Sequence, residues 1–127
     1  MPLILVLLAL LAASLPAGPA RAHAILLDSR PALRGTVPAG AATLSLRFNS
    51  RIDRARSRLV LLRPDGTQAV LPLPAEGPPD RLEAPADLSP GAYTVRWQVL
   101  AVDGHITRGD VPFTVVPGAP SASQPAR

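Results

Sequence analysis

The sequence predicts an all-β sandwich or barrel for the part of the chain that follows residue 22. Apolar and polar residues alternate along several segments, which is the period of a half-buried strand. Turn sequences rich in proline and glycine separate these segments about every 8–12 residues. No segment after residue 22 shows a convincing 3.6-residue repeat, so helices are not expected there.

The first half of the predicted domain contains a clear strand, a hairpin and a loop. Apolar and polar residues alternate over residues 44–48, which predicts a half-buried strand. Two apolar runs at residues 59–62 and 68–71 flank Pro64-Asp65-Gly66, and this turn predicts a hairpin because proline presets φ and glycine accepts positive φ. Residues 72–80 hold four prolines and are expected to form a loop or a distorted edge, since proline cannot donate to a strand ladder.

The second half contains the best strand in the chain. A short strand is expected at residues 82–83, before a turn at residues 89–91. Strict alternation over residues 93–99 then places one tyrosine, one tryptophan and two valines on a single face. Alternation resumes on a final strand at residues 111–115. Residues 117–127 have almost nothing to bury, so this tail is expected to be disordered.

Residues 1–22 have the pattern of a cleavable signal peptide, so we expect the protein to be exported. Residues 3–15 form an apolar run, and Ala20 and Ala22 supply the small-x-small pattern of a cleavage site. The run is shorter than the about 20 apolar residues that a transmembrane helix needs, and a buried core helix is a weaker alternative at this extreme position. Cleavage after Ala22 makes His23 the first residue, whereas a second small-x-small frame, ending two residues later, would remove it.

The composition limits the classes of function that are open to this chain. There are no cysteines, so disulfides and thiolate metal sites are excluded. All 13 basic residues are arginine, and without Arg21 the remaining 12 face nine acidic residues, a formal charge of +3. Nucleic acid is not expected as a partner, because only four aromatic residues accompany this charge. One arginine cluster is interpreted as a solvated face, with a docking face as the alternative: Arg51, Arg54, Arg56 and Arg58.

The sequence does not predict an enzyme. Its serines lie in no recognised nucleophile motif, and no glycine-rich phosphate loop is present. Among the acidic residues only Asp103 and Asp110 fall in one loop, which is weak support for paired-carboxylate chemistry.

The two histidines carry the most distinctive chemistry. A cleaved chain would hold an α-amine and an imidazole on His23, and these two nitrogens can chelate one metal ion together. His105 offers a third nitrogen and Asp103 an oxygen, and residues two apart on an extended segment point to the same side. Cu(II) favours such a tetragonal set of ligands, and an amine that titrates near pH 7.7–8.0 loses its proton readily. On these residues alone, an Asp-Gly turn followed by an exposed, idle histidine is the simpler interpretation.

Three stretches resemble the copper resistance protein CopC family of periplasmic copper-binding proteins. They are HAILLDSRPALRG at 23–35, LSLRFNSRID at 44–53 and LSPGAYTVRWQVLAVDGHITRGDVPFTV at 88–115. The last stretch is the most specific, because a Val-x-Trp is followed by Asp-Gly-His and then by Phe-x-Val. The resemblance spans residues 23–116, which is almost the whole predicted domain.

The resemblance implies an immunoglobulin-like Greek-key β-sandwich or barrel of about seven strands. It also implies an exported, periplasmic protein of copper resistance or homeostasis, with one Cu(II) ion bound by His23, Asp103 and His105. An inner-membrane copper transport protein is the implied partner in delivery. A monomer is expected, and no apolar run that could span a membrane follows residue 22.

Departures from some relatives narrow the implied site. The only methionine is Met1, so the separate Cu(I) site of methionine-rich relatives is not expected. A glutamate that some relatives carry after the early strand is absent, because that stretch reads Phe48-Asn49-Ser50, and the residue after the histidine is Ile106 instead of proline. Two alternatives stay open: a structural or adhesive β-sandwich without a metal site and, with less support, a small copper oxygenase.

Overall fold

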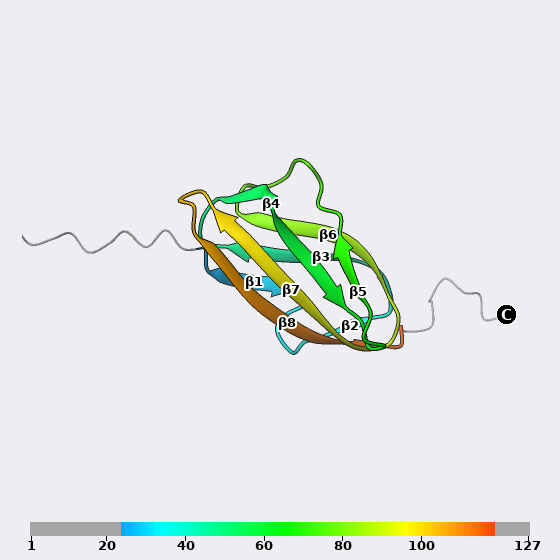
Figure 1. The fold of residues 1–127 in the computed structure, drawn as a ribbon. Coiled ribbons are helices and arrows are strands. Elements are labelled where there is room, and N and C mark those ends of the chain that lie inside the picture. Colours follow the sequence, from blue (N-terminus) through cyan, green and yellow to red (C-terminus); the bar gives the residue numbers. More distant parts are fainter. Residues whose placement is uncertain (1–23, 119–127) are drawn as a thin grey trace, which may run out of the picture.

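The computed structural model describes residues 24–118, which form eight strands in two packed sheets (Figure 1). The smaller sheet has the strand order β1-β3-β6, and the larger sheet has the order β2-β8-β7-β4-β5. The bounds of the strands are β1 (Leu26–Arg30), β2 (Thr36–Pro38), β3 (Gly40–Phe48), β4 (Ile52–Leu62), β5 (Gln68–Leu71), β6 (Arg81–Leu88), β7 (Gly91–Ala101) and β8 (Ile106–Val116).

The connections confirm the expected all-β sandwich. Two of them, β4–β5 and β7–β8, are hairpins within the larger sheet, and the other connections between described strands cross from one sheet to the other. The count of eight strands is one above the expected number of about seven. The least obvious strand in the sequence is β2, three residues long, which pairs parallel to β8 along residues 114–116.

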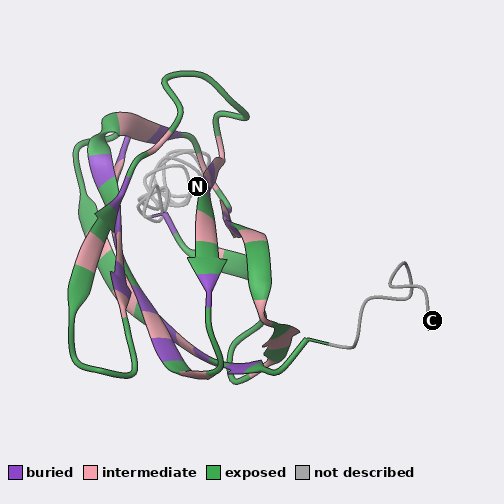
Figure 2. Cartoon of the chain, turned by 90° about the vertical axis from the view of Figure 1, so that its right-hand side faces the viewer, coloured by how far each residue is buried: buried purple, intermediate pink, exposed green. Residues whose placement is uncertain are grey.

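The core lies between the sheets and is built by the alternating strands. Along β7 the side chains of Tyr93, Val95, Trp97 and Val99 are buried, as the alternation of the sequence predicts. Phe48 of β3 meets the Trp97 ring edge-on, with ring centroids 5.2 Å apart, so the two sheets are joined by an aromatic contact. Figure 2 shows the resulting alternation of buried and exposed residues along the strands.

The predicted hairpin and loop are both present. Strands β4 and β5 pair antiparallel around Pro64-Asp65-Gly66, and Gly66 has φ of +87°. The hydroxyl and the backbone N–H of Thr67 both donate to Asp65 Oδ1, at 2.7 and 2.9 Å, and they hold the pKa of that carboxyl below its ordinary value. Residues 72–80 form no strand, and Arg54 Nη2 ties this loop down by donating to the carbonyl of Pro78 at 2.6 Å.

Strand β6 is longer than the predicted pair of residues 82–83. It continues to Leu88 although Pro85 lies within it, opposite Thr43 of β3. Proline is tolerated there because β6 is an edge strand of the smaller sheet, so no neighbouring strand needs the missing N–H.

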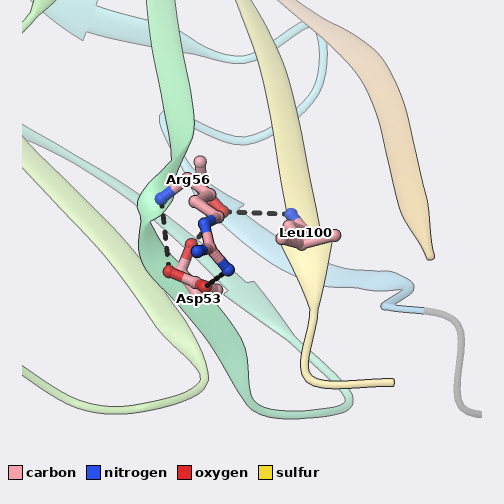
Figure 3. Close-up of polar contacts among 4 residues, drawn as sticks. Asp53, Arg56 and Leu100 are labelled. Carbon is pink, nitrogen blue, oxygen red and sulfur yellow. Dashed lines mark hydrogen bonds and ion pairs between the residues drawn. The ribbon is translucent and has the colours of Figure 1, made fainter. Parts of the chain in front are cut away.

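Strand β4 is also longer than predicted, and an irregularity interrupts its pairing with β7. Asp53 pairs with Leu100, but pairing resumes only at Arg58, opposite Gln98. Within the bulge, Asp53 accepts the backbone N–H of Arg56 at 3.2 Å and also contacts its guanidinium (Figure 3). The buried Ser57 hydroxyl donates to the Asp53 carbonyl at 2.6 Å and accepts the N–H of Leu100 at 3.1 Å. A side chain thus replaces the missing backbone bond just before β7 ends.

Three predictions fall on residues outside the described range: the signal peptide at 1–22, the histidine at 23 and most of the tail at 117–127. Among residues 24–118, no helix has the length and apolar character needed to cross a bilayer.

Candidate metal site

A tight turn joins β7 to β8 and presents Asp103 and His105. The Ala101 N–H donates to the His105 carbonyl at 2.9 Å, and the Gly104 N–H donates to the Ala101 carbonyl at 2.9 Å. Gly104 has φ of +91°, a conformation that glycine adopts without a Cβ penalty. The Val102 N–H reaches the Arg51 carbonyl at 3.3 Å, which fastens the turn to the start of β4.

The structure brings the side chains of Asp103 and His105 into direct contact. Asp103 Oδ2 lies 2.7 Å from His105 Nδ1, and Asp103 Oδ1 accepts the His105 backbone N–H at 3.0 Å. An ionised carboxylate only accepts hydrogen bonds, so a neutral ring in this contact carries its proton on Nδ1 and its lone pair on Nε2. The carboxylate therefore selects the imidazole nitrogen that can bind a metal ion.

This arrangement differs from the expected one. Two side chains on an extended segment would stand parallel, whereas here the backbone turns at Gly104 and the carboxylate folds onto the ring. The His105 side chain is 61% exposed and that of Asp103 is 23% exposed. The ring is therefore more exposed than the carboxylate, which is partly enclosed.

The start of the described chain lies at the end of the sandwich that also carries the β7–β8 turn (Figure 1). Ala24 is buried, and its carbonyl accepts a hydrogen bond from the Thr107 hydroxyl at 2.9 Å. The Ile25 N–H donates to Asn49 Oδ1 at 2.7 Å, and the Asn49 N–H donates to the Ile25 carbonyl at 3.0 Å. Thr107 follows His105 by two residues, so the first described residue is tied to the strand that His105 precedes.

The two predicted ligands within the described range are thus together, and the third predicted ligand, His23, precedes that range. Within residues 24–118, no set of three or more histidine, cysteine and acidic side chains is gathered in a way that could hold a metal ion. Sequence reasoning missed Thr107 and Asn49. Nothing in the local sequence distinguishes them, because a threonine on a strand and an asparagine in a loop are ordinary.

The members of the predicted arginine cluster at residues 51–58 have different surroundings in the fold. Arg54 bonds the 72–80 loop and Arg56 contacts Asp53, so both have partners within the protein. Arg58 instead lines a hollow of about 440 Å³ on the outer face of the larger sheet. In that hollow Arg96 pairs with Asp110 at 3.0 Å, and this hydrogen bond raises the pKa of the guanidinium above its ordinary value. These side chains form a charged surface, and their arrangement suggests no catalysed reaction.

Comparisons with known proteins point in one direction. The model of the CopC domain family matches residues 26–116. The protein YobA of Escherichia coli strain K12 is 36% identical over 113 residues, which cover 85% of this chain and 90% of YobA. YobA of Shigella flexneri matches with the same identity and coverage.

Solved structures agree with the sequence comparisons. The crystal structure of CopC from Methylosinus trichosporium OB3b has a TM-score of 0.68 and 31% identity, and covers 77% of this chain and 98% of that one. PcoC from Escherichia coli, described as a methionine-rich copper resistance protein, has a TM-score of 0.59 and 24% identity, with 75% and 100% covered. The second likeness concerns the fold alone.

Proposed function

This chain belongs to the CopC family of copper resistance proteins, and we propose that it is an exported carrier or buffer that binds one Cu(II) ion. The family binds copper and is not enzymatic, which agrees with the expectation that this chain is not an enzyme. One observation carries the finer proposal. The Asp103–His105 pair lies at the end of the sandwich where the described chain begins, one residue after His23.

The proposed ligands are two nitrogens of His23, Nε2 of His105 and a carboxylate oxygen of Asp103. The contact with Asp103 supports Nε2 as the binding nitrogen of His105, because it occupies Nδ1. A carboxylate offers about four lone-pair positions, so Asp103 can bind an ion and still accept the His105 N–H. Cleavage after Ala22 supplies the amine of His23.

The oxidation state follows from the donor types. Cu(I) prefers thiolate and thioether ligands, and this chain has no cysteine and only Met1 as methionine. Amine, imidazole and carboxylate donors suit Cu(II). Two histidines in the whole chain support a single ion.

The cellular setting is part of the proposal. We place the signal peptide at residues 1–22 and the copper-binding domain, in the periplasm, at residues 23–116. The exposed ring of His105 suits handing copper to an inner-membrane copper transport protein, with this chain acting as a monomer. The main alternative is a β-sandwich that serves in structure or adhesion and has no metal site.

Titration with Cu(II) separates these functions. The chain that begins at His23 should bind one equivalent, as measured by competition with a chelator of known affinity. His105→Ala should weaken binding by more than the about 10- to 100-fold that outer-shell substitutions cost metal sites. Val102→Ala is the matched control, because Val102 is exposed in the same turn and offers no metal ligand. Absence of tight binding in the unsubstituted chain would exclude the copper carrier.

A further inference from the structure

The backbone directly after His23 is fixed by two side chains from distant parts of the sequence. Thr107 donates to the carbonyl of Ala24 across 83 residues, and Asn49 accepts the N–H of Ile25 across 24 residues. Asn49 also donates its own N–H to the Ile25 carbonyl. We call Thr107 and Asn49 the N-terminal clamp. Both contacts lie before β1 begins at Leu26.

The clamp acts on the first residues of the domain. The first few residues of a domain are poorly ordered unless they are tied down. Here Ala24 is only 2% exposed, although it would be the second residue after cleavage behind Ala22. Thr107 is itself half-buried, so its bond to the Ala24 carbonyl is partly shielded from water. This shielding makes the bond costly to leave unmade.

The clamp also links the two halves of the proposed metal site. One Cα step of about 3.8 Å separates Ala24 from the residue before it. Thr107 is two residues from His105 on a nearly extended segment, a spacing of about 7 Å. Within the clamp, Thr107 alone thus joins the residue after the proposed N-terminal ligand to the strand that follows His105, through a single hydrogen bond. Ligands that are ordered in advance cost less entropy when the ion binds.

On this basis we infer that Thr107 and Asn49 are positioning residues for copper. They hold the backbone of residues 24 and 25, which directly follows the proposed N-terminal ligand, at the end of the sandwich where His105 lies. This inference rests on the proposed function. Neither residue is assigned as a ligand.

The test uses the chain that begins at His23 and the variant Thr107→Val, which keeps the shape and removes the hydroxyl. The Cu(II) dissociation constant should rise about fivefold, because without this hydrogen bond the backbone of residues 24 and 25 must be ordered when the ion binds. Thr107→Ser should restore it. Thr114→Val is the matched control, because Thr114 is exposed on the same strand and its hydroxyl makes no hydrogen bond among the described residues.

A double-mutant cycle separates positioning from general stability. In a chain that combines His23→Ala with an acetylated amine, residue 23 offers neither nitrogen to the ion, so Thr107→Val should leave the residual copper affinity unchanged. An equal fold-change in both chains, or none in either, would overturn the clamp while leaving the proposed function intact. No tight binding by the unsubstituted chain contradicts the proposed function itself, and the clamp with it. Should circular dichroism show that Thr107→Val is unfolded, Asn49→Ala carries the same test.

Discussion

Gly109 lies directly opposite Trp97 on the β7–β8 ladder, and the indole ring fills the space that a side chain at position 109 would need. A Cβ built on Gly109 would lie 2.5 Å from Cζ2 and 2.6 Å from Cε2 of that ring. Contacts this short require the ring or the strand to move. The same ring meets Phe48 edge-on, so a displacement of the Trp97 ring would disturb an aromatic contact between the two sheets.

Gly109→Ala should therefore destabilise the protein by about 1–3 kcal/mol, the usual cost of overpacking. Chemical denaturation followed by fluorescence measures this directly, because Trp97 is the only tryptophan. Gly118→Ala is the control, since a Cβ there would meet only the Ala39 carbonyl at 3.4 Å, an ordinary contact. Equal stability of the two variants would show that the ring has room to shift.

Ser57→Ala should destabilise the protein by about 1–3 kcal/mol, because it leaves the Leu100 N–H and the Asp53 carbonyl without their partner. Urea denaturation measures this free energy of unfolding. Ser45→Ala is the control, since Ser45 lies on β3 and its hydroxyl makes no hydrogen bond within the described part of the chain. A change below a few tenths of a kcal/mol would mean that water replaces the hydroxyl.

Copper binding should weaken as pH falls through about 7.7. Below that pH the α-amine of His23 carries a proton, and Cu(II) must displace it before the nitrogen can bind. The apparent association constant should fall by up to about tenfold per pH unit from this one proton. Competition titrations between pH 6 and pH 8 measure it. A chain whose His23 amine is acetylated lacks the chelating amine and should show a shallower slope, and identical slopes would contradict an amine ligand.

The regular part of the fold was predictable because its residues alternate without interruption. The strand at 93–99 needs no other information, since each second side chain enters the core. Pro64-Asp65-Gly66 is similarly informative, because its turn chemistry is local. The proximity of Asp103 and His105 was also predictable, since the two residues lie two apart, but their direct contact was not.

Features that depend on distant partners were not predictable. The alternation predicted a strand only at residues 82–83, and the place of Pro85 on a sheet edge explains why β6 continues through it. The bulge in β4 depends on the Ser57 hydroxyl meeting Leu100, 43 residues away. Thr107 contacts Ala24 over 83 residues, and no local pattern marks either residue. Long-range pairing of single hydroxyls leaves no periodic trace in a sequence.

The most direct test of the central claim is a pair of Cu(II) titrations on chains that differ only in the N-terminal amine. The chain that begins at His23 should bind one equivalent, and the same chain with its His23 amine acetylated should bind at least about a hundredfold more weakly, because the blocked amine cannot bind the ion. Both chains keep Asp103, His105 and the clamp, so the folded domain itself serves as the control. Equal affinities in the two chains, or no tight binding in either, would contradict a copper site built on the cleaved N-terminus.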